Sequence, residues 1–529
     1  MTVTDDVRAH HYGDPAAVVP ASPWRTPLDG LDWFSACQGD APFVTAVAHD
    51  GTETTVNYRT AAAASRALAG WLCAEFGTTR PAVLAFAPTN DVPSVLTVLA
   101  VLRAGFGLLM LGPADPPERH ALQLEAAGAL ATLHLPGTDA PHPDSRALPH
   151  WREPAEPAAS PPPLDPAADA LYFATSGSTA ASKLVAQTHV NAVANAEAVR
   201  RHHGLVRGDR VLACLPIHHV NGLHFTVLGT MLAGAHTVLC ESFSPLGYPA
   251  TLQTFRPRIA SVVPGILEAL VETWRRPRLP AEFAYFVSAA APLTSRTARA
   301  VADRLGARVL QGYGLSETTN FSCTLPPSLS DATYRELMLE ADIPSVGTAV
   351  YGNEVAVLDP AGAPLPAGEV GEICMRGHNV MSRYVHNANA TREAFRGGWF
   401  HSQDLGYRIE RDGRGLFVLT GRLKNIAKVA GESVSLDEMD RALRALPQVR
   451  DAACVTVPDR FAGEKIVAAV VLSGEGQTGT AGLTGSLRAT FPEGVLPSQV
   501  IALPAIPRTT TGKVLRPQLR DDLSALGRG

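Results

Sequence analysis

The chain has 529 residues, of which 46% are hydrophobic and 18% are charged, and its formal net charge is −5. A single hydrophobic core rarely grows beyond about 250–300 residues, so this length predicts more than one domain. The mild acidic balance gives no general attraction to nucleic acid or to an anionic membrane surface, and neither is expected as a partner.

The seven cysteines are scattered and include no Cys-x-x-Cys pair, which favours free thiols in a reducing compartment. Residues 1–6 show no basic start followed by an apolar run, so no signal peptide is expected. Residues 212–240 lack Lys, Arg, Asp and Glu, but Pro216 and several Gly interrupt them. We interpret them as a buried strand, helix and strand, not as a membrane span. A cytoplasmic location is predicted.

After an irregular start at residues 1–30, helix-like and strand-like patterns alternate along the chain. The helical patterns cover 58–76, 91–103, 118–127, 223–232 and 295–305. The extended patterns cover 82–86, 108–111, 171–173, 210–215, 236–240, 259–263, 283–287 and 308–310. A Pro- and Asp-rich connector without fixed structure is expected at 136–168. The alternation predicts an α/β fold with parallel sheets, in two units of similar style at 58–135 and 171–310.

The pattern changes after about residue 345. Short strand patterns at 354–358, 371–375 and 416–419 are separated by Gly and Pro turns, and they predict a small antiparallel or barrel-like subdomain. The last hundred residues predict a separate α+β unit. Ser435 and Glu438 have the capping-box spacing at the start of a helix to 446, and strand patterns at 452–457 and 465–472 precede a Gly- and Thr-rich connector at 474–485.

A loop rich in Ser and Thr follows the strand at 171–173 and ends at Lys183. Its hydroxyl and backbone N–H groups could wrap a phosphate, with Lys183 adding positive charge. It is not a Walker loop, because Ser182 and Leu184 occupy the flanking positions of that pattern. A polar linker is the alternative. Lys513 follows a Thr-Gly turn. It likewise has two interpretations, a donor to phosphate or carboxylate, or an ordinary surface charge.

Cys214, His218 and His219 mimic a metal-ligand cluster. On one strand and loop they would point in alternating directions, so a zinc site is not expected there.

Six motifs, in order along the chain, resemble those of the adenylate-forming superfamily, in its acyl- and aryl-CoA synthetase-like branch. They are the phosphate loop at 175–183, the acid-pocket motif at 216–222, the adenine and metal motif at 311–317, the ribose motif at 399–404, the hinge at 421–424 with the segment to Gly431, and the lysine motif at 511–513.

The resemblance implies a large N-terminal adenylation core at 1–421, made of two parallel-type α/β subdomains and a small β-barrel-like subdomain. It also implies a small, mobile α+β C-terminal lid at 422–529, joined at the hinge residue Lys424. The implied activity is ATP-dependent activation of a carboxylic acid as acyl-AMP with release of pyrophosphate, followed by transfer to a thiol of coenzyme A or of a phosphopantetheine carrier protein. ATP and Mg²⁺ are the implied cofactors, and a monomer or homodimer is expected.

The resemblance also assigns roles to individual residues. Lys513 would bridge the substrate carboxylate and the α-phosphate, where charge develops in the transition state. Glu317 and Thr179 would bind Mg²⁺, which prefers oxygen ligands. Asp404, assisted by Arg422, would bind the ribose hydroxyls.

The remaining assignments concern the rest of the nucleotide and the acid. The β- and γ-phosphates would contact Thr175, Ser176, Gly177, Ser178, Thr179 and Lys183. The adenine and its surroundings would contact Ala290, Ala291, Pro292, Tyr313, Gly314 and Ser316. The acid pocket would comprise Val220, Asn221, Ala289, Gly312, Leu315 and His219, the last also as a catalytic, acid-positioning residue.

Several positions depart from the family pattern. Ala180 and Ser182 replace the usual Gly and Pro of the phosphate loop, and Gln403 replaces the Gly before Asp404. Ala289 adds a methyl group at a position where the family often has Gly at the bottom of the acid pocket, which indicates a compact acid. Because residues 216–239 contain no carboxylate for an amino group, an aryl, cinnamoyl-type or short acyl acid is preferred to a free amino acid.

Two alternatives remain open. The same scaffold could serve a non-thiol acceptor such as nitrite, in a diazo-forming biosynthetic enzyme. The altered phosphate loop could instead mark a non-catalytic nucleotide-binding relic.

Overall fold

The computed structural model describes residues 22–526, apart from 141, 143, 153–158, 176–182, 276–277, 430, 460–462, 474–479, 481, 489 and 510–511. The chain divides into two compact units. Unit 1 comprises Met1–Val355, Cys374–His401 and Arg411–Leu416. Unit 2 comprises Ala356–Ile373, Ser402–Glu410 and Phe417–Gly529.

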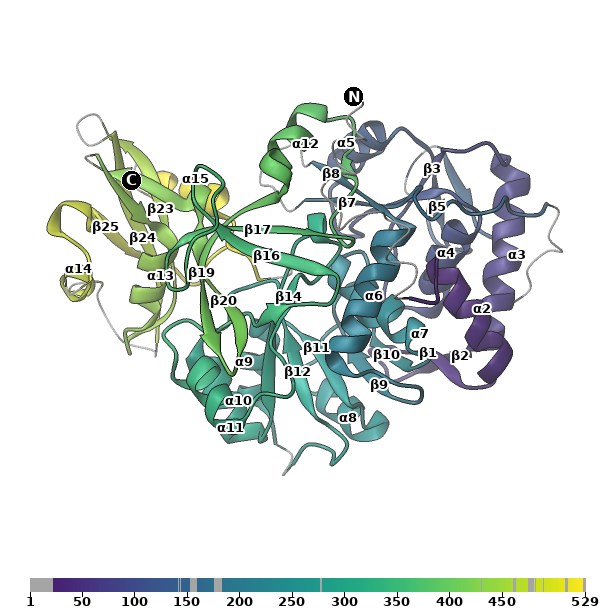
Figure 1. Cartoon of the computed structure of the whole chain (residues 1–529), viewed down its shortest axis with the longest axis horizontal. Coiled ribbons are helices and arrows are strands. Elements are labelled where there is room, and N and C mark those ends of the chain that lie inside the picture. The colour runs from purple at the N-terminus through teal and green to yellow at the C-terminus, as the bar shows by residue number, and fades with distance from the viewer. Residues whose placement is uncertain are drawn as a thin grey trace. The chain divides into compact units, whose positions relative to one another are not determined.

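Unit 1 contains a seven-stranded sheet in the order β18-β8-β7-β4-β3-β5-β6 (Figure 1). In this order the strands are Arg383–Tyr384, Leu184–Thr188, Asp169–Ala174, Gly107–Met110, Val83–Phe86, Ala129–His134 and Ser145–Ala147. Strands β7 to β6 are parallel neighbours, and β8 and β18 extend the sheet in antiparallel fashion. Both β3 and β4 are buried at every position, as expected of parallel strands covered on both faces.

Unit 1 also contains a nine-stranded sheet in the order β15-β14-β13-β12-β11-β9-β10-β1-β2. In this order the strands are Thr348–Ala349, Cys323–Thr324, Arg308–Tyr313, Tyr285–Ser288, Ile259–Val262, Arg210–Ala213, His236–Cys240, Pro42–Val47 and Glu53–Asn57. The strands from β13 to β1 are parallel, and antiparallel strands lie at both edges. The predicted α/β class with parallel sheets is confirmed.

Helices connect these strands. They are α2 Pro27–Gln38, α3 Tyr58–Phe76, α4 Val92–Arg103, α5 Pro117–Ala127, α6 His189–His203, η2 Asn221–Gly229, α7 Thr230–Leu232, α8 Gly247–Phe255, α9 Pro264–Thr273, α10 Ser295–Leu305, η3 Ser316–Thr318, α11 Asp331–Tyr334, η4 Arg335–Glu340 and α12 Ala388–Ala394. Side-chain caps explain several starts: Asn57, Asp91 and Thr294 accept hydrogen bonds from the first-turn N–H groups of α3, α4 and α10.

A four-stranded sheet follows in the order β16-β17-β19-β20, and the division between the units passes through it. Its strands are Asn353–Leu358, Gly371–Gly377, Phe400–Arg411 and Arg414–Arg422. This sheet corresponds to the small subdomain predicted from the Gly and Pro turns.

The C-terminal part of unit 2 contains a five-stranded sheet in the order β22-β21-β24-β23, with β25 paired to β24. The strands are Glu432–Ser435, Ile426–Val429, Gly463–Leu472, Val449–Asp459 and Gln499–Ala502, and the helices are α13 Leu436–Arg444, α14 Leu483–Leu487 and α15 Arg516–Leu526. Ser435 accepts a hydrogen bond from Glu438 N–H, so the predicted cap of α13 is confirmed.

The structure differs from the sequence-based predictions in several segments. Helix α2 begins at Pro27, inside the stretch predicted to be irregular, because the Asp29 carboxylate accepts a 2.8 Å hydrogen bond from the Thr26 N–H and Pro27 suits the first turn. Strands β1 and β2 were not predicted; β1 pairs with β10, a long-range contact, and β2 pairs with β1. Strand β6 lies within the predicted connector and pairs with β5. Residues 221–229 form a π-helix instead of an α-helix.

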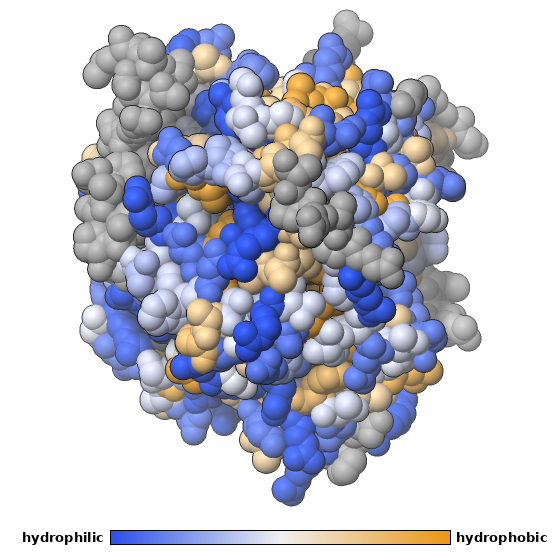
Figure 2. All heavy atoms as spheres, turned by 90° about the vertical axis from the view of Figure 1, so that its right-hand side faces the viewer, coloured by the Kyte–Doolittle hydropathy of each residue, from blue (hydrophilic) through white to orange (hydrophobic). Residues whose placement is uncertain are grey.

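No helix among the described residues is long and apolar enough to cross a membrane. One face of the molecule carries hydrophobic residues in small groups between hydrophilic ones (Figure 2). Single exposed hydrophobic residues of this kind are ordinary on protein surfaces. The seven cysteines are free, as predicted.

Candidate active site

The predicted phosphate loop joins the antiparallel strands β7 and β8. Thr175 N–H donates to the carbonyl oxygen of Lys183 at 2.9 Å, which closes the base of the loop. Ser176, Gly177, Ser178 and Thr179 lie outside the described residues.

Lys183 and Glu317 lie against the same tyrosine. The ammonium Nζ of Lys183 is 4.6 Å from the centre of the Tyr384 ring. The Tyr384 hydroxyl donates a 2.9 Å hydrogen bond to Oε1 of Glu317. Burial, and then the Glu317 carboxylate, raise the pKa of Tyr384, so the phenol remains a donor at neutral pH. The structure thus brings together two residues predicted to hold phosphate and metal, through a third that the sequence reading missed.

The loop that presents Glu317 is held in a strained conformation. Thr319 has φ 64°, which is unusual for a β-branched residue. Its hydroxyl donates to the Asn379 carbonyl at 2.6 Å, and the Asn379 amide donates to the carbonyls of Thr318 and Phe321. Met381 N–H donates to the Glu317 carbonyl at 2.7 Å. These bonds fix the backbone of Glu317.

The adenine motif spans the end of β13 and the loop after it, and two of its glycines are required by close packing. A Cβ at Gly314 would lie 1.6 Å from the carbonyl oxygen of Asn320, and one at Gly312 would lie 2.7 Å from the Phe321 ring. Tyr313 at the end of the strand is buried. The carbonyl of Ser316 accepts a 2.8 Å bond from the Gln187 amide.

The segment predicted on the other side of the adenine follows β12. Ser288, the last residue of β12, pairs in register with Gln311 of β13, so both motifs begin at the carboxyl ends of neighbouring parallel strands. Ligands bind at such ends in α/β proteins. Ala290 and Pro292 are exposed, Ala291 is half-buried and Ala289 is buried.

The acid-pocket motif connects β9 to the π-helix η2. His219 N–H donates to the Pro216 carbonyl at 3.0 Å, which forms a tight turn. Val220 is half-buried, and Asn221, the first residue of η2, hydrogen-bonds both Ser261 and Asn320. Leu315 N–H donates to the Thr318 hydroxyl.

A cavity of about 450 Å³ lies at the carboxyl ends of strands from both sheets of unit 1. Its walls include Asn90, Asp91, Pro113, His218 and Glu241. Burial lowers the pKa of His218 to about 4, although Asp115 opposes the shift, so the imidazole is neutral at pH 7. Of the predicted acid-pocket motif, only Pro216 and His218 line this cavity.

In unit 2, the predicted ribose pair is in direct contact. The Nε atom of Arg422 lies 2.7 Å from Oδ1 of the buried Asp404 carboxylate. Gln403, where the family has Gly, adopts φ 62°. Its N–H donates to Oε1 of Glu372 at 2.9 Å, which helps to hold this conformation.

Lys424 lies in the short 3₁₀ turn Leu423–Asn425, next to this pair. Its pKa is lowered, first by burial and then by Arg422, with Asp404 opposing the shift. Asp437 accepts hydrogen bonds from the Arg422 N–H and the Asn425 amide, which ties the turn to the first turn of α13.

Lys513 belongs to unit 2 and lies on its own tight turn. Thr509 N–H donates to the Lys513 carbonyl at 2.8 Å, Lys513 N–H donates to the Thr509 hydroxyl at 3.1 Å, and Gly512 has φ 85°. Arg508 donates to the Gly512 carbonyl at 2.7 Å. These bonds hold the backbone of Thr509, Gly512 and Lys513.

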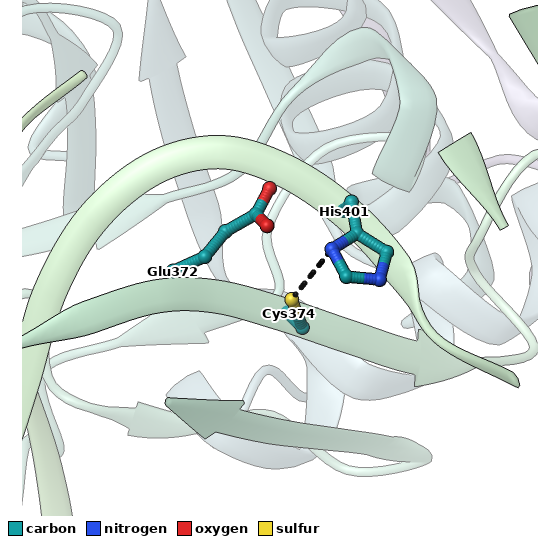
Figure 3. A group of neighbouring side chains, drawn as sticks. All are labelled: Glu372, Cys374 and His401. Atoms are coloured by element: carbon teal, nitrogen blue, oxygen red, sulfur yellow. Dashed lines mark hydrogen bonds between the residues drawn. The ribbon is translucent and has the colours of Figure 1, made fainter. Parts of the chain in front are cut away.

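One group of potential metal ligands occurs among the described residues, and it is not the group of Cys214, His218 and His219, where no zinc site was expected. Glu372 and Cys374 on β17 and His401 on β19 offer ligand atoms within 4.8 Å of one another (Figure 3). His401 Nε2 lies 3.1 Å from the Arg396 carbonyl, which can only accept, so Nδ1 faces the Cys374 sulfur at 3.4 Å as an acceptor. This hydrogen-bonded group needs no ion to be satisfied.

The comparisons with known proteins agree with these motifs. A family model described as AMP-binding enzyme matches residues 31–385, and one described as AMP-binding enzyme C-terminal domain matches residues 438–513. Sulfoacetate–CoA ligase of Cupriavidus necator is 34% identical over 71% of this chain and 72% of its own length. Feruloyl-CoA synthase of an Amycolatopsis species is 31% identical over 66% and 69%.

Solved structures show the same fold. The o-succinylbenzoate CoA synthetase of Bacillus subtilis, in complex with its acyl-adenylate intermediate, aligns with a TM-score of 0.81 at 24% identity, over 93% of this chain and 98% of that one. Together, the two family models and the relatives show that the chain belongs to the AMP-binding enzyme family, in the acyl-CoA synthetase-like branch of the adenylate-forming superfamily.

Proposed function

We propose that this chain is an AMP-forming acid–thiol ligase, which activates a carboxylic acid with ATP and transfers the acyl group to the thiol of coenzyme A. In the first step a carboxylate oxygen attacks the α-phosphorus, and the bond to the pyrophosphate leaving group breaks. In the second step the thiol sulfur attacks the acyl carbon, AMP leaves, and the thiol proton is released. Relatives named as CoA ligases support coenzyme A over a carrier protein.

The contact of Tyr384 with both Lys183 and Glu317 carries this proposal. Tyr384 thus lies against the Lys183 ammonium, a cation suited to the terminal phosphates, and against the Glu317 carboxylate, a group suited to Mg²⁺. One Glu317 oxygen accepts from Tyr384, and the other is the ligand atom proposed for the metal, with Thr179. Bound Mg²⁺ would neutralise phosphate charge.

The remaining roles follow the family pattern. Asp404, supported by Arg422, would accept hydrogen bonds from the ribose hydroxyls. Lys513 would meet the charge that develops between the carboxylate and the α-phosphate, where a donor lowers the barrier most. A division at 1–421 and 422–529, with rotation about Lys424, would exchange Lys513 for the Gly431 segment between the two steps.

The substrate proposed is a compact acid of the aryl, cinnamoyl-type or short acyl classes. His219, Val220, Asn221, Ala289, Gly312 and Leu315 would surround it. Relatives named for sulfoacetate, oxalate and feruloyl substrates span small and aryl acids.

A panel of carboxylic acids scored for pyrophosphate release, with and without coenzyme A, tests the proposal. We expect release that depends on one class of acid, and an acyl-CoA product. Release that requires nitrite would favour the other acceptor, and thermal stabilisation by ATP without release from any acid would favour the nucleotide-binding relic.

A further inference from the structure

Three uncharged side chains form a hydrogen-bonded chain beside the acid-pocket motif. The Ser261 hydroxyl donates to Oδ1 of Asn221 at 2.8 Å. The Asn221 amide in turn donates to Oδ1 of Asn320 at 3.4 Å. Ser261 and Asn320 are buried, and Asn221 is half-buried. We call these three residues the amide relay.

The amide relay lies where ligands bind in α/β folds. Ser261 is in β11, one residue before its carboxyl end, Asn221 opens η2, and Asn320 lies between η3 and β14. The loop from Gly314 to Asn320 follows β13, which lies two strands from β11 in the same sheet. The carboxyl edge of such a sheet is the expected ligand site.

Asn320 is held rigidly. Its N–H donates to the Thr318 carbonyl at 2.6 Å and its carbonyl accepts from the Thr318 hydroxyl at 3.1 Å. Gly314 packs so closely against the same carbonyl that the Asn320 backbone has no room to move towards it. The direction of the Asn320 side chain is therefore fixed before any ligand binds.

The amide nitrogen of Asn320 is buried and has no hydrogen-bond partner in the described part of the chain. A buried donor without an acceptor destabilises the fold, so such groups in native proteins call for a specific reason. An acceptor on a bound ligand would satisfy this N–H. Since Oδ1 of Asn320 is already used by Asn221, the open position is a donor.

The charge around the amide relay limits what the ligand can be. Residues 212–240, 259–263 and 309–325 contain no Lys or Arg. A second anionic group would be buried there without a cation from these segments, which is costly. An uncharged acceptor carries no such penalty.

We propose that the acid activated by this enzyme carries a second, uncharged hydrogen-bond acceptor, a hydroxyl, carbonyl or amide oxygen, which the Asn320 amide binds. This inference rests on the proposed function, because it takes the acid-pocket motif, to which Asn221 belongs, to bind the acid. Asn221 and Ser261 orient the Asn320 amide and so act as positioning residues.

Matched pairs of acids test this proposal: butyrate with 3-hydroxybutyrate and acetoacetate, benzoate with the hydroxybenzoates, and cinnamate with the hydroxycinnamates. For the wild type we expect kcat/KM for at least one polar acid to exceed that of its apolar partner by about tenfold or more, since a site built to bond a polar group rejects the analogue that lacks it. Asn320→Leu, which is close in size, should reduce this ratio to about two or less.

The matched control is Thr324→Val. Thr324 is buried on β14, its hydroxyl also has no partner among the described residues, and it lies outside the amide relay, so this variant should keep the wild-type ratio. Ser261→Ala provides a milder variant, which should lower the ratio about threefold while preserving the melting temperature within a few degrees.

The outcomes separate the two claims. Wild-type release of pyrophosphate with no preference for any polar acid would overturn the inference and leave the proposed function standing. A fall in kcat/KM of Asn320→Leu that is equal for both acids of a pair would overturn the inference as well. No release from any acid would overturn the proposed function, and the inference with it.

Discussion

The Tyr384 hydroxyl donates a 2.9 Å hydrogen bond to Glu317 across 67 positions of sequence. The same ring lies 4.6 Å from the Lys183 ammonium, within the range of a cation–π contact. Tyr384 is in β18, the antiparallel edge strand that pairs with β8 directly after the phosphate loop. The two charged groups proposed to face the triphosphate are thus oriented by one buried aromatic side chain.

Replacing Tyr384 with Phe keeps the ring and removes only this donor. We expect the Mg²⁺ concentration for half-maximal pyrophosphate release to rise about tenfold or more, because a hydrogen bond to a charged group contributes about 1.5–3 kcal/mol. Tyr351→Phe is the control, since Tyr351 is 43% exposed and packs under Arg201. An equal effect in both variants would contradict the role of Tyr384.

The alternation of strand and helix patterns predicted the parallel sheets for a physical reason. Alternating strands and helices leave few topologies, and the carboxyl ends of parallel strands collect the loops that follow them. Asp404 and Arg422, 18 positions apart, were expected to act together, and their atoms lie 2.7 Å apart. The family resemblance was sufficient there, and the contact forms because β19 and β20 are neighbouring strands.

The supporting residues could not be read from sequence. They are Tyr384, Asn379 and Glu372. Each one hydrogen-bonds a backbone group or a single carboxylate oxygen of a residue that only the tertiary fold brings next to it. None of them lies in a motif with a distinctive spacing. Strands β1 and β2 were not predicted for a similar reason. Strand β1 joins the sheet by pairing with β10, almost 200 residues away, and β2 joins it through β1.

Glu372 supports the predicted ribose ligand indirectly. Its Oε1 accepts from Gln403 N–H at 2.9 Å, and the Ser402 hydroxyl donates to the Ile373 carbonyl at 2.6 Å. These bonds hold Gln403 at φ 62°, which Gly adopts freely and Gln does not. The direction of Asp404, the next residue, therefore depends on Glu372.

Glu372→Gln should raise KM for ATP about threefold to tenfold with little change in KM for 2′,3′-dideoxy-ATP, which lacks the hydroxyls that Asp404 would bind. Nucleotide titrations of pyrophosphate release measure both constants. The double variant Glu372→Gln with Gln403→Gly should recover much of the loss, because Gly needs less support at this φ. Equal losses with both nucleotides would show a general structural effect instead.

His224 makes stability depend on pH. Burial lowers its pKa to about 3, and its Nε2 lies 2.7 Å from the Gln187 amide oxygen. The folded state therefore binds the proton more weakly than the unfolded chain, whose His pKa is about 6.5. The stabilisation is complete above about pH 6.5 and is lost as pH falls from there towards 3.

For His224→Gln we expect a lower melting temperature at pH 7.5 but a shallower decline between pH 6.5 and 4.5. Each pKa unit corresponds to about 1.4 kcal/mol, so this single group accounts for about 2–3 kcal/mol of that decline. Thermal melts across the pH range measure it. His150→Gln, at an exposed position, is the control, and a slope equal to the wild type in His224→Gln would refute the assignment.

Loss of the Lys513 ammonium should slow adenylate formation and have little effect on thiol transfer. A backbone hydrogen bond from Thr509 N–H to the Lys513 carbonyl and a bond from Lys513 N–H to the Thr509 hydroxyl do not involve the Lys513 side chain, so Lys513→Ala removes the ammonium and keeps both bonds. A donor to the developing charge contributes a few kcal/mol, and we expect adenylate formation to fall about 10²–10³-fold. Thiol transfer from a supplied acyl-adenylate should fall less than threefold, because by then the Gly431 segment would have replaced the lysine. Lys465→Ala, which removes a surface ion pair with Asp459, should leave both steps unchanged. Equal losses in the two half-reactions of Lys513→Ala would place the lysine outside the adenylation transition state.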